Sequence, residues 1–185
     1  MSSEREELRQ IIRRLSYEER EVTLASGRKS NFYFDGKQTT LHPRGALLVG
    51  KAFLEELAHF PAPVQGVGGL TLGADPIATA VAIASAMADS PVPGFIIRKE
   101  PKGHGTGQWL EGRKNLPVGA RVVIVEDVLT TGGSALKAVD RAREEGLEVI
   151  GIITLVDRQE GGREIVEAAG LPLRSVFTKA EITAA

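Results

Sequence analysis

The chain contains no cysteine, a single tryptophan and few aromatic residues overall. The lack of cysteine excludes a disulfide framework, a thiolate metal site and a cysteine nucleophile. The longest apolar stretch, residues 77–88, is rich in alanine and falls short of the roughly 20 residues that cross a bilayer. Residues 1–10 are polar and charged, unlike a signal peptide. We therefore expect a soluble protein of the reducing cytoplasm.

Neither sign of charge dominates, since 23 basic and 24 acidic residues leave a net charge of −1. A general nucleic-acid surface is therefore not indicated. The 185 residues fit one domain with room for a small subdomain. A chain of this length buries enough apolar surface to fold without disulfides or a metal ion.

Hydrophobic spacing predicts helices and strands that alternate along most of the chain. The near-continuous apolar residues 121–125 are typical of a strand that is buried on both faces. The alternation predicts an α/β fold, with a central parallel sheet flanked by helices and ligands bound beyond the carboxyl ends of the strands. The predicted helices are 3–15, one from 43, one from about 76, 132–145 and 164–169, and the predicted strands are 31–34, 64–67, 95–97, 121–125, 149–156 and 175–178.

Two acidic residues, Glu126 and Asp127, directly follow the predicted strand 121–125. Such carboxylates suit hydroxyl groups, a metal ion or a developing positive charge. A turn comes next, in which glycines permit close approach of a ligand, and hydroxyls and helix-start N–H groups favour phosphate. A ligand with a phosphate at one end and a sugar diol in its middle fits the whole segment. The turn residues are Thr130, Thr131, Gly132, Gly133 and Ser134.

Three other interpretations of this segment are less favoured. A capped strand-to-helix turn would leave two adjacent acids without a partner. The Gly-x-x-x-x-Gly-Lys-Ser/Thr pattern of a P-loop is missing, and in a dinucleotide-binding turn the acid follows the glycines instead of preceding them.

A basic segment follows the predicted strand 95–97. Arg98, Lys99, Lys102 and His104 lie within seven residues, among glycines and a proline that disfavour regular structure. Cations in a mobile loop would stabilise a departing pyrophosphate, whose negative charge grows as its bond breaks, and closure of the loop would strengthen each contact by excluding water. Taken alone, the segment would also fit a solvated surface loop or a nucleic-acid contact.

The acid pair and its turn resemble the phosphoribosyl diphosphate (PRPP) motif of type I phosphoribosyltransferases. The resemblance implies the fold of that family, with a central parallel sheet and a small N-terminal hood. It implies a single domain, 1–185, with the hood at about 1–40 plus the C-terminal segment and the core at about 41–170. The PRPP-binding residues would be Arg98, Lys99, Lys102, His104, Glu126, Asp127, Val128, Leu129, Thr130, Thr131, Gly132, Gly133 and Ser134, with the acids on the ribose and Thr130 to Ser134 on its 5-phosphate.

Three further segments, residues 24–34, 98–105 and 155–162, are similar to orotate phosphoribosyltransferases. The resemblance implies transfer of ribose 5-phosphate from PRPP to N1 of orotate, which gives orotidine 5′-monophosphate and pyrophosphate in pyrimidine (UMP) biosynthesis. It also implies a homodimer with active sites shared between subunits. Arg98, Lys102 and His104 would reach the partner's site, while Lys99 would serve its own.

The same resemblance assigns roles around the base and the leaving group. Arg158 and Thr130 would contact orotate, whose carboxylate a guanidinium grips bidentately, with Tyr33 and Phe34 beside the base. Taken alone, Arg158 would also fit an ion pair with Asp157 or Glu160, and Tyr33 and Phe34 would also fit an ordinary core. The catalytic residues would be Lys102 and His104 at the leaving pyrophosphate and Asp127 near the anomeric carbon. Mg²⁺ is the expected cofactor, held mainly by the diphosphate.

The sequence departs from the orotate family's pattern in two places. Many members have a lysine where Ala25 stands, and many have Tyr-Lys-Gly where Leu72 and Gly73 stand. Lys29 and Lys37 are candidates to replace the missing hood charge. Two other functions stay open at this point: transfer to a purine or to uracil on the same scaffold, and a regulator of this fold that binds RNA or DNA.

Overall fold

A six-stranded sheet forms the centre of the molecule, and the computed structural model describes residues 2–23, 29–101 and 108–184. The strand order is β5-β4-β3-β6-β7-β8, and all neighbours are parallel except β5, which is antiparallel to β4. The expected α/β fold is thereby confirmed. These strands are β3 (Gly66–Leu70), β4 (Gly94–Ile97), β5 (Leu110–Glu111), β6 (Arg121–Leu129), β7 (Glu148–Asp157) and β8 (Leu173–Thr178).

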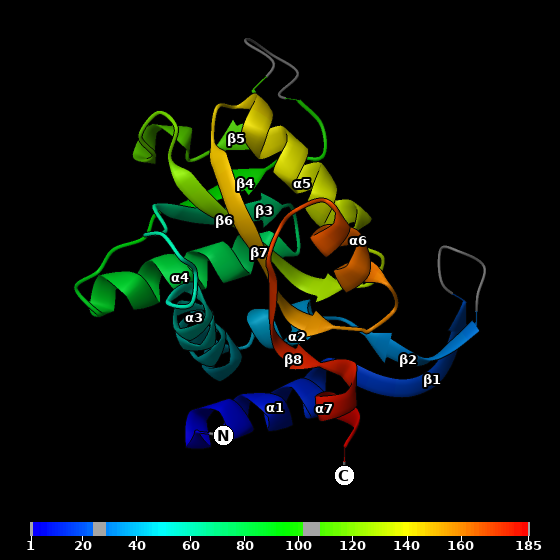
Figure 1. Cartoon of the computed structure of the whole chain (residues 1–185). Coiled ribbons are helices and arrows are strands. Elements are labelled where there is room, and N and C mark those ends of the chain that lie inside the picture. The colour runs from blue at the N-terminus through cyan, green and yellow to red at the C-terminus, as the bar shows by residue number, and fades with distance from the viewer. Residues whose placement is uncertain (1, 24–28, 102–107, 185) are drawn as a thin grey trace.

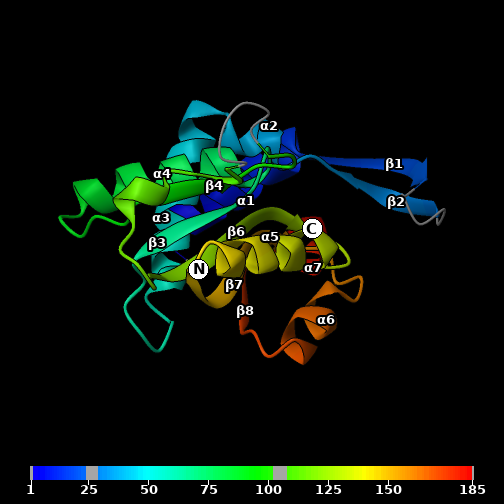
Figure 2. The same ribbon diagram turned by 90° about the horizontal axis from the view of Figure 1, so that it is seen from above.

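Helices cover both faces of this sheet. They are α1 (Ser3–Leu15), α2 (Lys37–Thr40), α3 (Pro43–Leu57), α4 (Ala74–Met87), α5 (Gly133–Glu144), α6 (Gly162–Ala168) and α7 (Lys179–Thr183), with a 3-10 turn at Arg113–Asn115. Figures 1 and 2 show α1, α3 and α4 on one side of the sheet and α5 and α6 on the other. Val123 and Val125 of β6 pack with the first group, and Val122 and Ile124 with α5. This double coverage explains the continuous apolar run that predicted β6.

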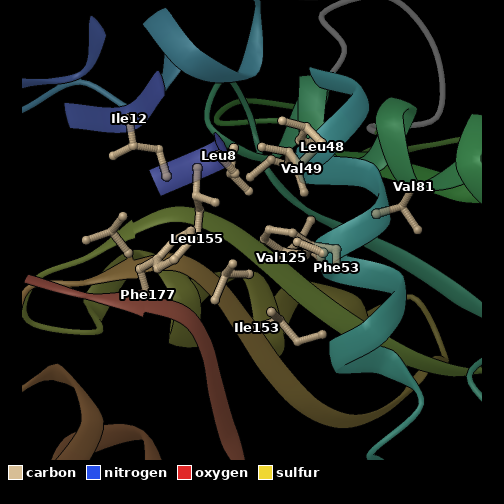
Figure 3. Close-up of a cluster of buried hydrophobic side chains, with 14 of the residues drawn as sticks. Leu8, Ile12, Leu48, Val49, Phe53, Val81, Val125, Ile153, Leu155 and Phe177 are labelled. Carbon is tan, nitrogen blue, oxygen red and sulfur yellow. The ribbon is translucent and has the colours of Figure 1, made fainter. Parts of the chain in front are cut away.

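The apolar core on the α1 side joins segments from both ends of the chain. Leu8 of α1 and Phe53 of α3 pack with Val125 of β6 and Phe177 of β8 (Figure 3). Next to this core, the buried carboxylate of Glu56 on α3 accepts hydrogen bonds from Arg5 of α1 at 3.3 Å and from Arg174 of β8 at 2.7 Å. Apolar packing and a buried ion pair therefore connect α1 to the sheet. Within the described residues, every helix is too short or too polar to cross a bilayer.

A hairpin of β1 (Tyr17–Thr23) and β2 (Lys29–Phe34) projects from the body of the molecule (Figures 1 and 2). Phe32 and Phe34 of β2 are buried with stacked rings 5.9 Å apart, and Tyr17 lies against Phe32 at 5.0 Å. Tyr33 lies under the Arg20 guanidinium at 4.0 Å. Successive side chains of a strand point to opposite faces, so Phe32 and Phe34 lie on one face of β2 and Tyr33 lies on the other.

The structure corrects the limits of two predicted strands. β6 continues to Leu129 instead of ending at 125, so Glu126 and Asp127 lie within the strand and not after it. The strand continues because β7 pairs along its full length, as far as Leu129 opposite Asp157. The strand expected at 64–67 is Gly66–Leu70, which is rich in glycine and therefore poor in strand-forming side chains. α2, β1, β5 and α7 were not predicted as such.

Candidate active site

The acid pair lies near the carboxyl end of β6, at the centre of the sheet. Glu126 pairs with Thr154 of β7 and is only 8% exposed. Its Oε2 is buried and has no hydrogen-bond partner among the described residues. Burial, together with the adjacent Asp127, raises the pKa of the Glu126 carboxyl to about 8. A buried carboxyl group without a complete set of partners is typical of a ligand site.

Asp127 is enclosed by two glycines from distant segments. A Cβ at Gly36, just before α2, would lie 2.8 Å from Asp127 Cβ, and a Cβ at Gly73, just before α4, would lie 2.4 Å from Asp127 Oδ1. The Gly73 position is also 3.4 Å from Glu126 Oε1. The turn after β3 therefore touches both acids, and only glycine fits at these distances. The Thr71–Leu72 peptide bond in this turn is cis.

A lysine from the hood side reaches the same carboxylate. Lys37 Nζ is 2.6 Å from Asp35 Oδ1 and 4.0 Å from Asp127 Oδ2. The bond to Asp35 raises the pKa of Lys37, and the Asp127 charge adds to the effect. Burial raises the pKa of Asp127, and Lys37 opposes that rise. The site therefore contains a cation beside two buried acids.

The turn between β6 and α5 presents an uncapped helix N-terminus. Gly132 takes φ +79°, and no side chain caps α5. Thr131, Gly133 and Ser134 are exposed, whereas Leu129 is buried and Val128 and Thr130 are partly buried. The start of α6 supports the turn from behind, because a Cβ at Gly162 would lie 2.7 Å from the Thr130 carbonyl oxygen. Free N–H groups at a helix start favour an anion.

Arg158, directly after β7, connects the sheet to the hairpin. Its Nη2 donates to the Phe32 carbonyl oxygen at 3.1 Å and lies 2.9 Å from Glu160 Oε1. The guanidinium also lies 5.1 Å from the centre of the Phe32 ring and is almost completely buried. The side chain of Phe34 belongs to the apolar core, so any ligand contact of this residue would be through its backbone.

The two ends of the basic segment are held together. The Arg98 N–H donates to the Trp109 carbonyl oxygen at 2.9 Å, and Arg98 Nη1 lies 3.2 Å from Glu111 Oε1. Lys99 is exposed. Lys102 and His104 lie outside the described residues, as does Ala25.

Three contacts of the acid pair were not predicted from the sequence. Gly36 and Gly73 carry no local signal that they approach Asp127. Lys37 was considered as a charge that replaces a hood lysine, without reference to the acids. The one hint in the sequence was that Gly36 and Lys37 are neighbours in the chain.

An acid pair beside an uncapped helix start, at the carboxyl edge of a parallel sheet, is shared with a known class of enzymes. The family model of the phosphoribosyl transferase domain matches residues 67–169, more than half of the chain. The chain therefore belongs to the phosphoribosyltransferases, a class of pentosyltransferases, and the expected class is confirmed.

Full-length relatives narrow the class. The orotate phosphoribosyltransferase of a Nostoc species is 52% identical over 96% of this chain and 84% of its own length. That of Aquifex aeolicus is 50% identical over 97% of each chain. The Mycobacterium tuberculosis orotate phosphoribosyltransferase in complex with PRPP superposes with a TM-score of 0.81 at 42% identity, covering 98% of this chain and 99% of that one. The chain belongs to the orotate phosphoribosyltransferase family.

Proposed function

We propose that this chain transfers ribose 5-phosphate from PRPP to N1 of orotate, releasing orotidine 5′-monophosphate and pyrophosphate for pyrimidine biosynthesis. The observation that carries the proposal is the contact of the buried Glu126 and the partly buried Asp127 with the turn after β3, next to the uncapped N-terminus of α5. A sugar diol fits the acids, a 5-phosphate fits the helix start, and a diphosphate fits the space beyond the acids.

In this proposal the turn after β6 holds the ribose 5-phosphate. The N–H groups of Gly133 and Ser134 donate to phosphate oxygens, Thr130, Thr131 and Ser134 add hydroxyls, and Gly132 provides the positive φ that starts the helix. Val128 and Leu129 fix the backbone that leads into the turn. Glu126, which holds its proton at neutral pH, can donate to a ribose hydroxyl, and Asp127 can accept from one.

Orotate would lie between the hairpin and the end of β7. Arg158 grips its carboxylate, Thr130 contacts the ring, and Tyr33 and the Phe34 backbone lie beside the base. The N1 nitrogen of orotate attacks the anomeric carbon of PRPP while the bond to pyrophosphate breaks. Asp127 stabilises the positive charge that develops on the ribose during this step. No strong protein base is required, since the ring nitrogen reacts as an anion or near-anion.

Arg98, Lys99, Lys102 and His104 would surround the departing pyrophosphate, and His104 can supply it with a proton. The described residues contain no group of three or more acidic or histidine side chains that could hold a metal ion. The proposed cofactor is Mg²⁺, which would be held mainly by oxygens of the diphosphate. When bound, the ion would neutralise charge on the leaving group. We expect the enzyme to work in the cytoplasm.

The exposed apolar surface around α4 supports the proposal of a homodimer. Asp75 is the only charged residue of α4. A helix that is apolar on every face is normally buried by other parts of the protein or by a partner. Leu72, Ile83 and Met87 are more than half exposed. Leu72 and Ile83 line a groove of about 510 Å³ that also includes Lys37, so a second copy seated there would adjoin the active site. Ile83→Glu should convert a dimer to a monomer in sedimentation; an unchanged dimer would exclude this surface as the interface.

The proposed reaction is tested by mixing the protein with PRPP, Mg²⁺ and orotate and following the orotate absorbance. Hypoxanthine and uracil are the matched control bases. We expect turnover with orotate alone. Turnover of another base while orotate stays inert would overturn the proposal, and a protein that ignores PRPP would overturn it entirely.

A further inference from the structure

We propose that Lys37 is a binding residue for the diphosphate end of PRPP, and that Asp35 is the positioning residue that holds it there. The sequence offered Lys37 only as a candidate to replace the missing hood charge, and it offered no role for Asp35. The inference rests on the proposed function and adds a specific contact to it.

The location of Lys37 carries the inference. Its ammonium lies 4.0 Å from Asp127 Oδ2, and the preceding residue, Gly36, lies directly against Asp127. The turn at Gly73 touches the same carboxylate at Oδ1. Lys37 and this turn therefore flank one carboxylate, and a ligand that meets Asp127 also meets the Lys37 ammonium.

The order of the phosphate-binding and diol-binding groups along the site indicates that Lys37 faces the diphosphate. The 5-phosphate belongs at the α5 N-terminus and the diol at the acids, which leaves the diphosphate beyond them. Without a cation there, the diphosphate would face the Asp127 carboxylate and be repelled. Arg158, which follows β7 and contacts Phe32, is the cation that the proposed function assigns to the orotate carboxylate.

Asp35 fixes the direction of the lysine side chain. It lies 2.6 Å from Lys37 Nζ, accepts from the Lys37 backbone N–H at 3.2 Å and accepts from Gln38 Nε2 at 3.2 Å. The Lys37 side chain remains 41% exposed, so an anion can reach it without movement of the main chain. A preorganised ammonium of this kind loses little conformational freedom when the ligand binds.

The test measures steady-state constants for both substrates in Lys37→Ala, Lys37→Arg and the control Lys51→Ala. Lys51 is a matched lysine, 45% exposed and ion-paired with Glu4 at 2.5 Å, far from the acids. In Lys37→Ala we expect the KM for PRPP and the inhibition constant of pyrophosphate to rise at least about 10-fold, with the KM for orotate changed less than about 3-fold. Lys37→Arg should recover most of the loss, and Lys51→Ala should match the parent enzyme.

A KM for PRPP that is unchanged in Lys37→Ala, or a larger loss for orotate than for PRPP, would overturn the inference. Asp35→Asn should weaken PRPP binding less than Lys37→Ala does, and the double variant should be no worse than Lys37→Ala alone, because the two residues act as a unit. Additive losses would exclude a positioning role for Asp35. Calorimetric titration of PRPP into each variant gives the same comparison without turnover, so an enzyme inactive on orotate would refute the proposed function while leaving Lys37 testable.

Discussion

Gly73 lies against the carboxyl group of Asp127, so closely that a Cβ would come within 2.4 Å of Oδ1. The turn after β3 and the acid pair of β6 therefore fit together only with glycine at this position. Gly73→Ala should displace Asp127 and lower kcat/KM for PRPP about 100-fold. Thermal unfolding should show that the fold is retained. Full activity in Gly73→Ala would show that the placement of Asp127 against this turn is not important.

Stability should depend on pH through Glu126. The pKa of its carboxyl is about 8 in the folded protein and near 4.5 when exposed, so the folded state holds the proton more tightly. The resulting stability is fully present below the exposed value and is lost as the pH rises through 8. The two pKa values differ by about 3.5 units, so at about 1.4 kcal/mol per unit the loss amounts to about 5 kcal/mol.

Urea unfolding at a series of pH values checks this prediction. The Glu126→Gln side chain cannot titrate. The unfolding free energy of this variant should therefore fall much less between about pH 5 and about pH 8 than that of the parent chain. Equal slopes in the two proteins would show that Glu126 ionises normally. Asp127 has a raised pKa as well, so part of the slope should persist in the variant.

Alanine variants of two glycines with similar backbone angles distinguish the effect of backbone strain from the effect on ligand binding. Gly132 has φ +79° at the start of α5, and Gly146 has φ +75° with open space around its Cβ position. Alanine at either site should cost about 1 kcal/mol of stability. Gly132→Ala should also raise the KM for PRPP at least about 10-fold, because the helix start moves, and Gly146→Ala should leave it unchanged. Identical kinetics in the two variants would contradict phosphate binding at this turn.

Arg158 should be specific for the orotate end. Arg158→Lys keeps the charge and loses the bidentate geometry, so the KM for orotate should rise about 10- to 100-fold with the KM for PRPP little changed. Arg174→Lys alters an ion-paired arginine on β8 and serves as the control. A rise confined to the KM for PRPP would assign Arg158 to the other substrate.

Lys102 is expected to act on the leaving group. Lys102→Ala should lower kcat about 100-fold or more while orotate affinity changes little, because the contact strengthens only as pyrophosphate departs. Lys114→Ala, a change in an exposed lysine of the 3-10 turn, should have no effect. Equal losses of kcat and orotate affinity in Lys102→Ala would contradict the role.

The features that local sequence determines were predictable. α1 follows from the spacing of Leu8, Ile11 and Ile12, and α3 begins at Pro43 as expected for proline in a first turn. The acid pair and the glycine turn were found because a buried strand, two acids and a helix start are adjacent in the chain. The limit of β6 was wrong by four residues, since its pairing with β7 is not visible in a local window.

The contacts between distant segments were not predictable. Asp127 meets Gly36 and Gly73 only after the chain before α2 and the turn after β3 have been brought to β6 by packing of the sheet and its helices. The short strand β5 exists only because Glu111 pairs with Ile96 across the basic segment. Gly68 and Gly69 of β3 lie beyond the predicted strand 64–67. Their small size allows the neighbouring strand β4 to approach closely, since a Cβ at Gly68 would lie 2.2 Å from the Phe95 carbonyl oxygen.

The buried Glu56 has a consequence for truncated versions of the protein. A chain that began at Tyr17 would remove Arg5 from this carboxylate and expose the cavity left by Leu8 and Ile12 to water. Its unfolding free energy would fall by several kcal/mol, as for loss of one partner of a buried ion pair together with core side chains. Residues 67–169, which the family model matches, therefore lack the α1 side chains that pack against the sheet and hold Glu56.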